Sequence, residues 1–117
     1  MIYIVDDDRE FAECIAKMVR KFFDGEIKIF SNAVEAISAI DAGLPKLVFL
    51  DILLDGPDGF TFLNEMSSYE DTASVPIVIM SSLNFTGKNL RNYGVVKILD
   101  KAEMTPEDVR RVIEAYV

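Results

Sequence analysis

The sequence predicts an α/β fold in which helices cover both faces of a five-stranded parallel sheet. Short apolar runs alternate along the chain with longer amphipathic segments, which is the order of repeated strand–helix units. The first of these runs, residues 2–5, is apolar throughout and is typical of a buried strand. Both observations favour a sheet that lies inside the molecule.

Five apolar runs are the predicted strands. The first and third are each followed by an acidic residue, the second alternates in polarity, and Pro76 opens the fourth. The fifth is the weakest. In chain order the predicted strands span residues 2–5, 26–30, 47–50, 75–80 and 95–99.

Four amphipathic segments are the predicted helices. Asp24-Gly25 stops the first helix, Ser31 or Asn32 caps the second, and Thr105 caps the last with Pro106 at its first position. Residues 84–93 are polar and poorly periodic, and predict a short helix at most. The four helices span residues 9–23, 33–43, 60–67 and 106–116.

Right-handed crossovers between five such strands favour the flavodoxin-like strand order 2-1-3-4-5. The 117 residues are predicted to form one domain, residues 1–117. Since Met1 directly precedes the first strand, we expect the N-terminus to be natural. Whether the chain is a complete regulator or the N-terminal piece of a longer protein stays open.

Composition excludes several classes of function. The net charge is −8, which argues against a nucleic-acid-binding surface. The chain has no His, so imidazole catalysis is excluded, and with a single Cys it lacks the ligands for a structural zinc site. Cys14, expected in the core, cannot form an internal disulfide, and no targeting or membrane-spanning segment is visible. We therefore expect a cytoplasmic protein, in which any metal is a hard cation such as Mg²⁺ or Ca²⁺.

Chemically active side chains follow four of the predicted strands. Asp6-Asp7-Asp8 follows the first, Asp51 the third, Ser81-Ser82 the fourth and Lys101 the fifth. The carboxyl ends of parallel strands share one edge, where ligands bind. Crowded carboxylates repel unless a cation lies between them, and Mg²⁺ favours oxygen ligands. Carboxylates, Mg²⁺, a lysine and a hydroxyl suit phosphoryl transfer, with an aspartate as nucleophile. Asp8 is predicted to be only the cap of the first helix.

These residues also form a pattern that covers nearly the whole chain. In order it comprises Val5-Asp6-Asp7, Leu50-Asp51, Asp58-Gly59, Pro76 to Ser82, Gly94 and Leu99-Asp100-Lys101. The pattern resembles the receiver domains of two-component response regulators, which share the fold of the chemotaxis regulator. The resemblance implies a phospho-accepting switch rather than a conventional enzyme. Its partners would be a sensor histidine kinase or histidine phosphotransfer protein and an unknown downstream protein or effector domain.

The resemblance also implies a role for each site residue. Asp51 accepts the phosphoryl group from a phosphohistidine. Lys101 and the Ser81 hydroxyl contact that group, together with the backbone N–H groups of Ser82 and Ile52. The implied ligands of Mg²⁺ are Asp6, Asp7, Asp51 and the backbone carbonyl of Leu53.

Several positions depart from the family pattern. Ala102 stands where the family usually has a proline in a cis bond, so we expect either a trans bond with a displaced Lys101 or a strained cis bond. Ile98 replaces a typical aromatic residue, and the segment between Ser81 and Gly94 is shorter than is usual in the family. We therefore expect the family's helix in that segment to be reduced, and the way in which the signal leaves the domain stays open. Leu53 and Leu83 cannot orient an attacking water, so a long-lived phosphoaspartate is expected.

Two alternatives stay open. One is a module of the same fold that binds proteins without phosphorylation, which Ala102 and Ile98 favour mildly. The other is a Mg²⁺-dependent phosphatase, but Leu53 stands where such an enzyme has a second aspartate.

Overall fold

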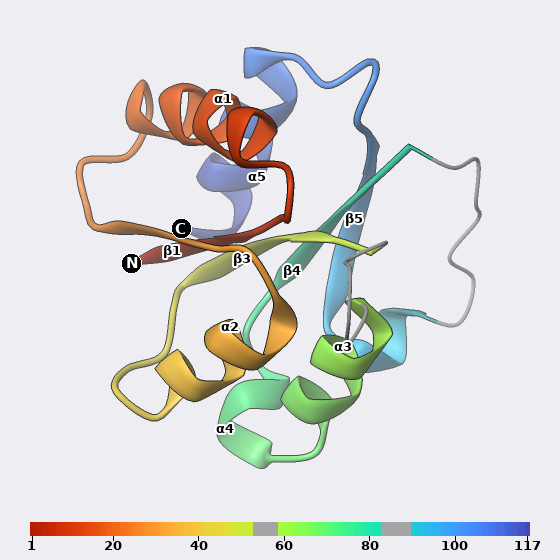
Figure 1. The fold of residues 1–117 in the computed structure, drawn as a ribbon. Coiled ribbons are helices and arrows are strands. Elements are labelled where there is room, and N and C mark those ends of the chain that lie inside the picture. Colours follow the sequence, from red (N-terminus) through yellow and green to blue (C-terminus); the bar gives the residue numbers. More distant parts are fainter. Residues whose placement is uncertain (53–58, 83–89) are drawn as a thin grey trace.

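The computed structural model describes residues 1–52, 59–82 and 90–117 and confirms the predicted fold class. The five strands are all parallel and lie in the order β2-β1-β3-β4-β5, as predicted (Figure 1). The strands are β1 (Ile2–Val5), β2 (Ile27–Phe30), β3 (Leu47–Asp51), β4 (Ile77–Ser81) and β5 (Val95–Asp100). The helices are α1 (Arg9–Arg20), α2 (Ala33–Ile40), α3 (Gly59–Ser67), α4 (Glu70–Ala73), the 3₁₀ helix η1 (Leu90–Tyr93) and α5 (Pro106–Tyr116).

Helices cover both faces of the sheet. Figure 1 shows α1 and α5 together on one face and α2 and α3 on the other. Because successive side chains of a strand point to opposite faces, β1 serves two cores. Ile2 and Ile4 pack with α1 and α5, whereas Tyr3 and Val5 pack with α2 and α3. This double burial explains why the central strands are apolar throughout.

Three helices begin at the predicted caps. The Asp8 carboxylate accepts a hydrogen bond from the Phe11 N–H (3.1 Å), and Asn32 accepts one from the Glu35 N–H (2.9 Å). Thr105 and Asp108 form a reciprocal capping box at the start of α5, with Pro106 in the first turn. These capping residues determine where the three helices begin.

Some element boundaries differ from the predictions. Helix α1 ends at Arg20, short of Asp24-Gly25, and the side chain of Phe22 is exposed. Strand β4 begins at Ile77, after Pro76, which has no N–H to give to a sheet. The four-residue helix α4 was not predicted, because its capping residue makes no side-chain hydrogen bond and the helix has one buried residue, Thr72.

The expectation that Cys14 lies in the core is wrong, since its side chain is exposed. The buried stripe of α1 consists of Ala12, Ile15, Ala16 and Val19, and Cys14 lies outside it. Helical position, rather than apolar character, therefore decides which side chain is buried.

The connection from β4 to β5 lies partly outside the described residues. Its described end is the 3₁₀ helix η1, followed by Gly94 with a φ of 83°. That left-handed conformation favours glycine and turns the chain into β5. None of the described helices is both long enough and apolar enough to cross a membrane.

Candidate functional site

The sheet brings the predicted site residues to one edge. Asp6 and Asp7 directly follow β1, Asp51 ends β3, Ser81 ends β4, and Lys101 follows β5. Strand register aligns these ends, because Val5 pairs with Leu50 and Asp51 pairs with Met80. Residues far apart in the sequence therefore meet at the carboxyl ends of neighbouring strands, as the predicted topology requires.

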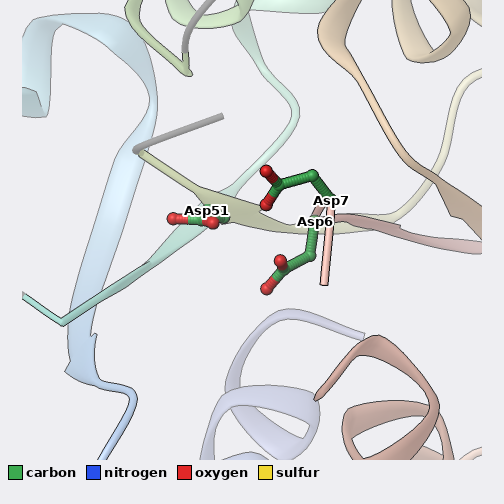
Figure 2. Close-up of side chains that lie close together, drawn as sticks. All are labelled: Asp6, Asp7 and Asp51. Carbon is green, nitrogen blue, oxygen red and sulfur yellow. The ribbon is translucent and has the colours of Figure 1, made fainter. Parts of the chain in front are cut away.

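Three carboxylates form a cluster at this edge. One oxygen each from Asp6, Asp7 and Asp51 lies within 4.8 Å of the others. Asp6 and Asp51 are buried, whereas Asp7 is exposed. Figure 2 shows the side chains of Asp6 and Asp7 diverging from the end of β1, with Asp51 beside them at the end of β3. Two of the three negative charges are thus held out of water.

Lys101 brings a positive charge between the two buried carboxylates. Its Nζ lies 2.8 Å from Asp6 Oδ2 and 3.2 Å from Asp51 Oδ2. The same ammonium lies 4.5 Å from the centre of the Phe11 ring. The Lys101 backbone N–H donates to the Ser81 carbonyl (2.9 Å), which ties the residue to the end of β4. Lys101 is therefore fixed at both its backbone and its charged end.

The bond between Lys101 and Ala102 is trans, and the expectation that a trans bond would displace Lys101 is wrong. A turn around Asp100 explains how the lysine stays in place. The Asp100 carboxylate accepts a hydrogen bond from the Ala102 N–H (2.8 Å), and its carbonyl accepts one from the Met104 N–H (3.0 Å). These bonds close the turn directly after Lys101.

Asp6 lies in an electrostatically unfavourable place. Its Oδ1 accepts a hydrogen bond from the Asp8 N–H (2.9 Å). Its Oδ2 is buried and contacts Lys101 as an ion pair, but this contact lacks hydrogen-bond geometry, and no other described residue donates to that oxygen. Burial raises the pKa of Asp6, helped by the charge of Asp51, and the contacts with Lys101 and Asp8 only partly oppose this.

The two carboxylates act on Lys101 in return. Burial alone would lower the pKa of Lys101, but the contacts and charges of Asp6 and Asp51 outweigh it and raise that pKa. The ammonium therefore stays charged, yet it balances only one of three negative charges. The cluster remains a strong attractor for a cation.

The remaining predicted residues lie around this cluster. Ser81 is buried at the end of β4, and Ser82 follows it and is exposed. The Ile52 N–H donates to the Met80 carbonyl at 3.4 Å, so it is engaged within the sheet. The predicted positions Leu53, Leu83 and Asp58 lie outside the described residues. The roles assigned to all these residues stay predictions.

Gly59 holds the start of α3 against the end of β3. Its N–H donates to the Ile52 carbonyl (3.2 Å), and a Cβ at this position would lie 2.7 Å from Ile52 Cα and 2.9 Å from the Asp51 carbonyl. Only glycine permits that approach. Ile52, the residue next to Asp51, is therefore held at both backbone groups, because its N–H donates to the Met80 carbonyl and its carbonyl accepts from the Gly59 N–H.

The contact between Phe11 and Lys101 was not predicted from the sequence. Phe11 is an apolar residue within the first predicted helix, and it packs partly buried against the core under α1. Its position three residues after the capping Asp8 was the available signal, because that places it in the first turn of α1, beside the acidic edge.

Comparisons with known proteins agree with this geometry. The family model for the response regulator receiver domain matches residues 2–114. The chain is 27% identical over 79% of its length to response regulator Rre1 from Synechocystis, and 34% identical over 71% of its length to the transcriptional regulatory protein RstA from Escherichia coli. These alignments span 40% and 33% of the relatives' own lengths.

A solved structure shows the same likeness in three dimensions. The receiver domain of NtrX from Brucella abortus matches with a TM-score of 0.79 and 25% identity, over 98% of this chain and 96% of that one. Because the family model covers nearly the whole sequence and the fold agrees, the chain belongs to the response regulator receiver domain family of two-component systems.

Proposed function

We propose that this domain accepts a phosphoryl group on Asp51 and thereby switches its contacts with other proteins. The donor would be a phosphohistidine on a sensor histidine kinase or a histidine phosphotransfer protein. The observation that carries the proposal is the contact of the Lys101 ammonium with Asp51, 3.2 Å away, inside a cluster of three carboxylates. An acidic edge with one fixed cation suits a reaction that depends on charge neutralisation and positioning.

The residues fit a bound Mg²⁺. The donors from Asp6, Asp7 and Asp51 are carboxylate oxygens, and the Leu53 carbonyl is the fourth proposed ligand. Ligand oxygens about 2.1 Å from Mg²⁺ lie roughly 3–4 Å apart, so the 4.8 Å cluster needs only a small closure. Asp6 Oδ2, which is buried and has the Lys101 ammonium 2.8 Å away as its ion-pair partner, gains a further partner if the ion or one of its waters binds there. When bound, Mg²⁺ would supply neutralisation of the charge that develops on the transferred group.

The chain's own residues would carry the transfer. An Asp51 carboxylate oxygen attacks phosphorus and forms the new P–O bond, while the P–N bond to the donor imidazole breaks and its electron pair stays on that nitrogen. Lys101 would then pair with a phosphoryl oxygen. The Ser81 hydroxyl and the Ser82 N–H would donate hydrogen bonds to the others. The Ile52 N–H would join them by leaving the Met80 carbonyl, to which it donates at 3.4 Å.

The result would be a switch rather than turnover of a substrate, although the domain would promote its own phosphorylation and dephosphorylation. The phosphoryl group adds negative charge and acceptor oxygens, and Ser81 at the end of β4 and the turn that carries Lys101 would rearrange to satisfy them. We place this domain at residues 1–117, in the cytoplasm, with a downstream protein or effector domain as its target. A lysine displaced from Asp51 would favour a module that works without phosphorylation. The contact between Lys101 and Asp51 argues against that alternative.

Intact-mass measurement tests the proposal. Wild-type protein incubated with acetyl phosphate and Mg²⁺ should gain the mass of one phosphoryl group, and excess EDTA should prevent the gain. Asp51→Asn should gain nothing, whereas the control Asp41→Asn, in which an exposed aspartate beyond α2 is changed, should behave as wild type. An equal gain in Asp51→Asn would show that another residue is the acceptor.

A further inference from the structure

The Phe11 ring packs against the core under α1 and also lies against the charged end of Lys101. Lys101 Nζ is 4.5 Å from the ring centre, within the range at which an ammonium is attracted to the face of an aromatic ring. The Lys101 side chain is 17% exposed, so water screens this attraction only in part. A leucine or methionine would fill similar space but would offer no negative π face.

Four residues, Asp6, Asp8, Phe11 and Lys101, are joined by a closed chain of contacts that includes the ammonium. Asp6 accepts a hydrogen bond from the Asp8 N–H, and Asp8 accepts one from the Phe11 N–H. The Phe11 ring contacts Lys101 Nζ, and Lys101 pairs with Asp6. The cap of α1 thus fixes the backbone of Phe11, and the ring and Asp6 approach the same ammonium. Asp51 approaches it as well, at 3.2 Å.

We propose that Phe11 is a positioning residue that holds the Lys101 ammonium at the two buried carboxylates, ready to meet the phosphoryl group. This inference rests on the proposed function, since it assigns to Lys101 the contact with that group. The long, flexible lysine side chain has many rotamers, and the ring restricts them without adding a charge that would compete with Mg²⁺. Phe11 acts through Lys101, whose ammonium lies between its ring and the two buried carboxylates.

The test compares three variants of the full chain. Phe11→Leu removes the ring and keeps an apolar side chain, and Phe11→Tyr keeps the ring. Phe23→Leu is the matched control, because Phe23 is a partly buried aromatic residue packed against the same core as Phe11. Circular dichroism and thermal unfolding establish that each variant is folded.

The first readout is the rate of phosphorylation by acetyl phosphate at saturating Mg²⁺. Phe11→Leu should be slower by about fivefold, the size expected when one cation–π contact is lost. Phe11→Tyr should restore most of the rate, and Phe23→Leu should match wild type. A Phe11→Leu rate equal to wild type, or an equal loss in Phe11→Tyr, would overturn the inference.

The second readout needs no phosphoryl group. In the NMR spectrum of the wild-type protein, the ring should shift the signals of the Lys101 methylene next to Nζ upfield. The shift should vanish in Phe11→Leu and persist in Phe11→Tyr and Phe23→Leu. A wild-type protein that takes up no phosphate would refute the proposed function, whereas unshifted methylene signals in wild type would refute the contact itself.

Discussion

Asp6 is a buried carboxylate whose surroundings disfavour its charged form. Its side chain is fully buried, one oxygen accepts no hydrogen bond, and burial raises its pKa. A folded-state pKa above the unfolded value means that the ionised form disfavours folding at neutral pH. The site therefore retains a charge that weakens the metal-free protein, which is typical of residues kept for function.

Replacing Asp6 with asparagine should stabilise the metal-free protein. Asp6→Asn removes a buried charge while Asp51 still pairs with Lys101, so the free energy of unfolding in EDTA should rise by about 1 kcal/mol. Urea denaturation measures the change. Asp7→Asn, which alters an exposed carboxylate, is the control and should have a smaller effect. A less stable Asp6→Asn protein in EDTA would contradict this interpretation.

Tyr3 should make the protein sensitive to alkaline pH. Burial, followed by the charge of Glu26, raises its pKa, and its hydroxyl donates toward the carbonyls of Ala39 (3.1 Å) and Gly43 (3.2 Å). The unfolded state loses this proton first as pH rises. The stability that the Tyr3 hydroxyl contributes is thus fully present below about pH 10 and is lost as pH rises through the folded-state pKa of Tyr3.

The free energy of unfolding, measured from pH 8 to 11, should fall above about pH 10 in wild type. The fall should be shallower in Tyr3→Phe. It should not disappear, since the raised pKa of Lys101 acts in the same direction. Tyr116→Phe, which changes an exposed ring, should keep the wild-type slope. Identical slopes in wild type and Tyr3→Phe would refute the assignment to Tyr3.

Among the secondary-structure elements, the start of α3 controls the surroundings of Asp51. A Cβ on residue 59 would collide with the backbone of Ile52 and Asp51. Gly59→Ala should therefore cost about 1–3 kcal/mol of unfolding free energy and slow phosphorylation, because the end of β3 must move.

Gly43→Ala is the matched control for that prediction. A Cβ there would meet only Met1 Cε at 3.6 Å, an ordinary contact, so the free energy of unfolding should change little. Denaturation curves and phosphorylation rates of the two variants should therefore differ clearly. Equal effects of the two substitutions would show that the close approach of α3 to β3 determines neither the stability nor the phosphorylation rate.

The elements that the sequence predicted well are those with strong local signals. Buried apolar runs marked the strands, and Asp8, Asn32 and Thr105 marked helix starts. Helix α4 has four residues and no side-chain cap, so it left no comparable pattern. The burial of Cys14 was predicted wrongly, because its residue type suggested burial while its place on α1 exposes it.

The site was predictable to the extent that topology decides it. Parallel strands share an edge, so residues that follow β1, β3, β4 and β5 had to meet. The position of the Lys101 ammonium was not predictable, since it depends on the turn at Asp100 and on the side-chain rotamer. The contact of the Phe11 ring with Lys101 was not predictable either, because a periodic pattern indicates which face of a helix is buried but not which side chains touch.

Considered as a whole, the molecule is a buried sheet that presents charge at one edge. Both faces are covered, so the strands hold the edge residues on a rigid support (Figure 1). The net charge of −8 further favours binding of a cation over binding of an anion. We expect the edge, rather than the core, to respond to metal and phosphoryl groups.

Metal binding should accordingly stabilise the whole molecule. A ligand that binds only the folded state adds about 2.7 kcal/mol at one hundred times its dissociation constant, so the melting temperature should rise with Mg²⁺ concentration. Asp7→Asn should lose most of that rise, whereas Asp41→Asn should keep it. A melting temperature independent of Mg²⁺ in wild type would argue against a metal site.

The most direct measurement is a crystal structure of the protein with Mg²⁺ and beryllium trifluoride, a mimic of the phosphoryl group. The account predicts one ion among the carboxylates of Asp6, Asp7 and Asp51, and the mimic attached to Asp51 with Lys101 Nζ in contact with it. An empty edge at saturating concentrations, or a mimic attached to another residue, would contradict it.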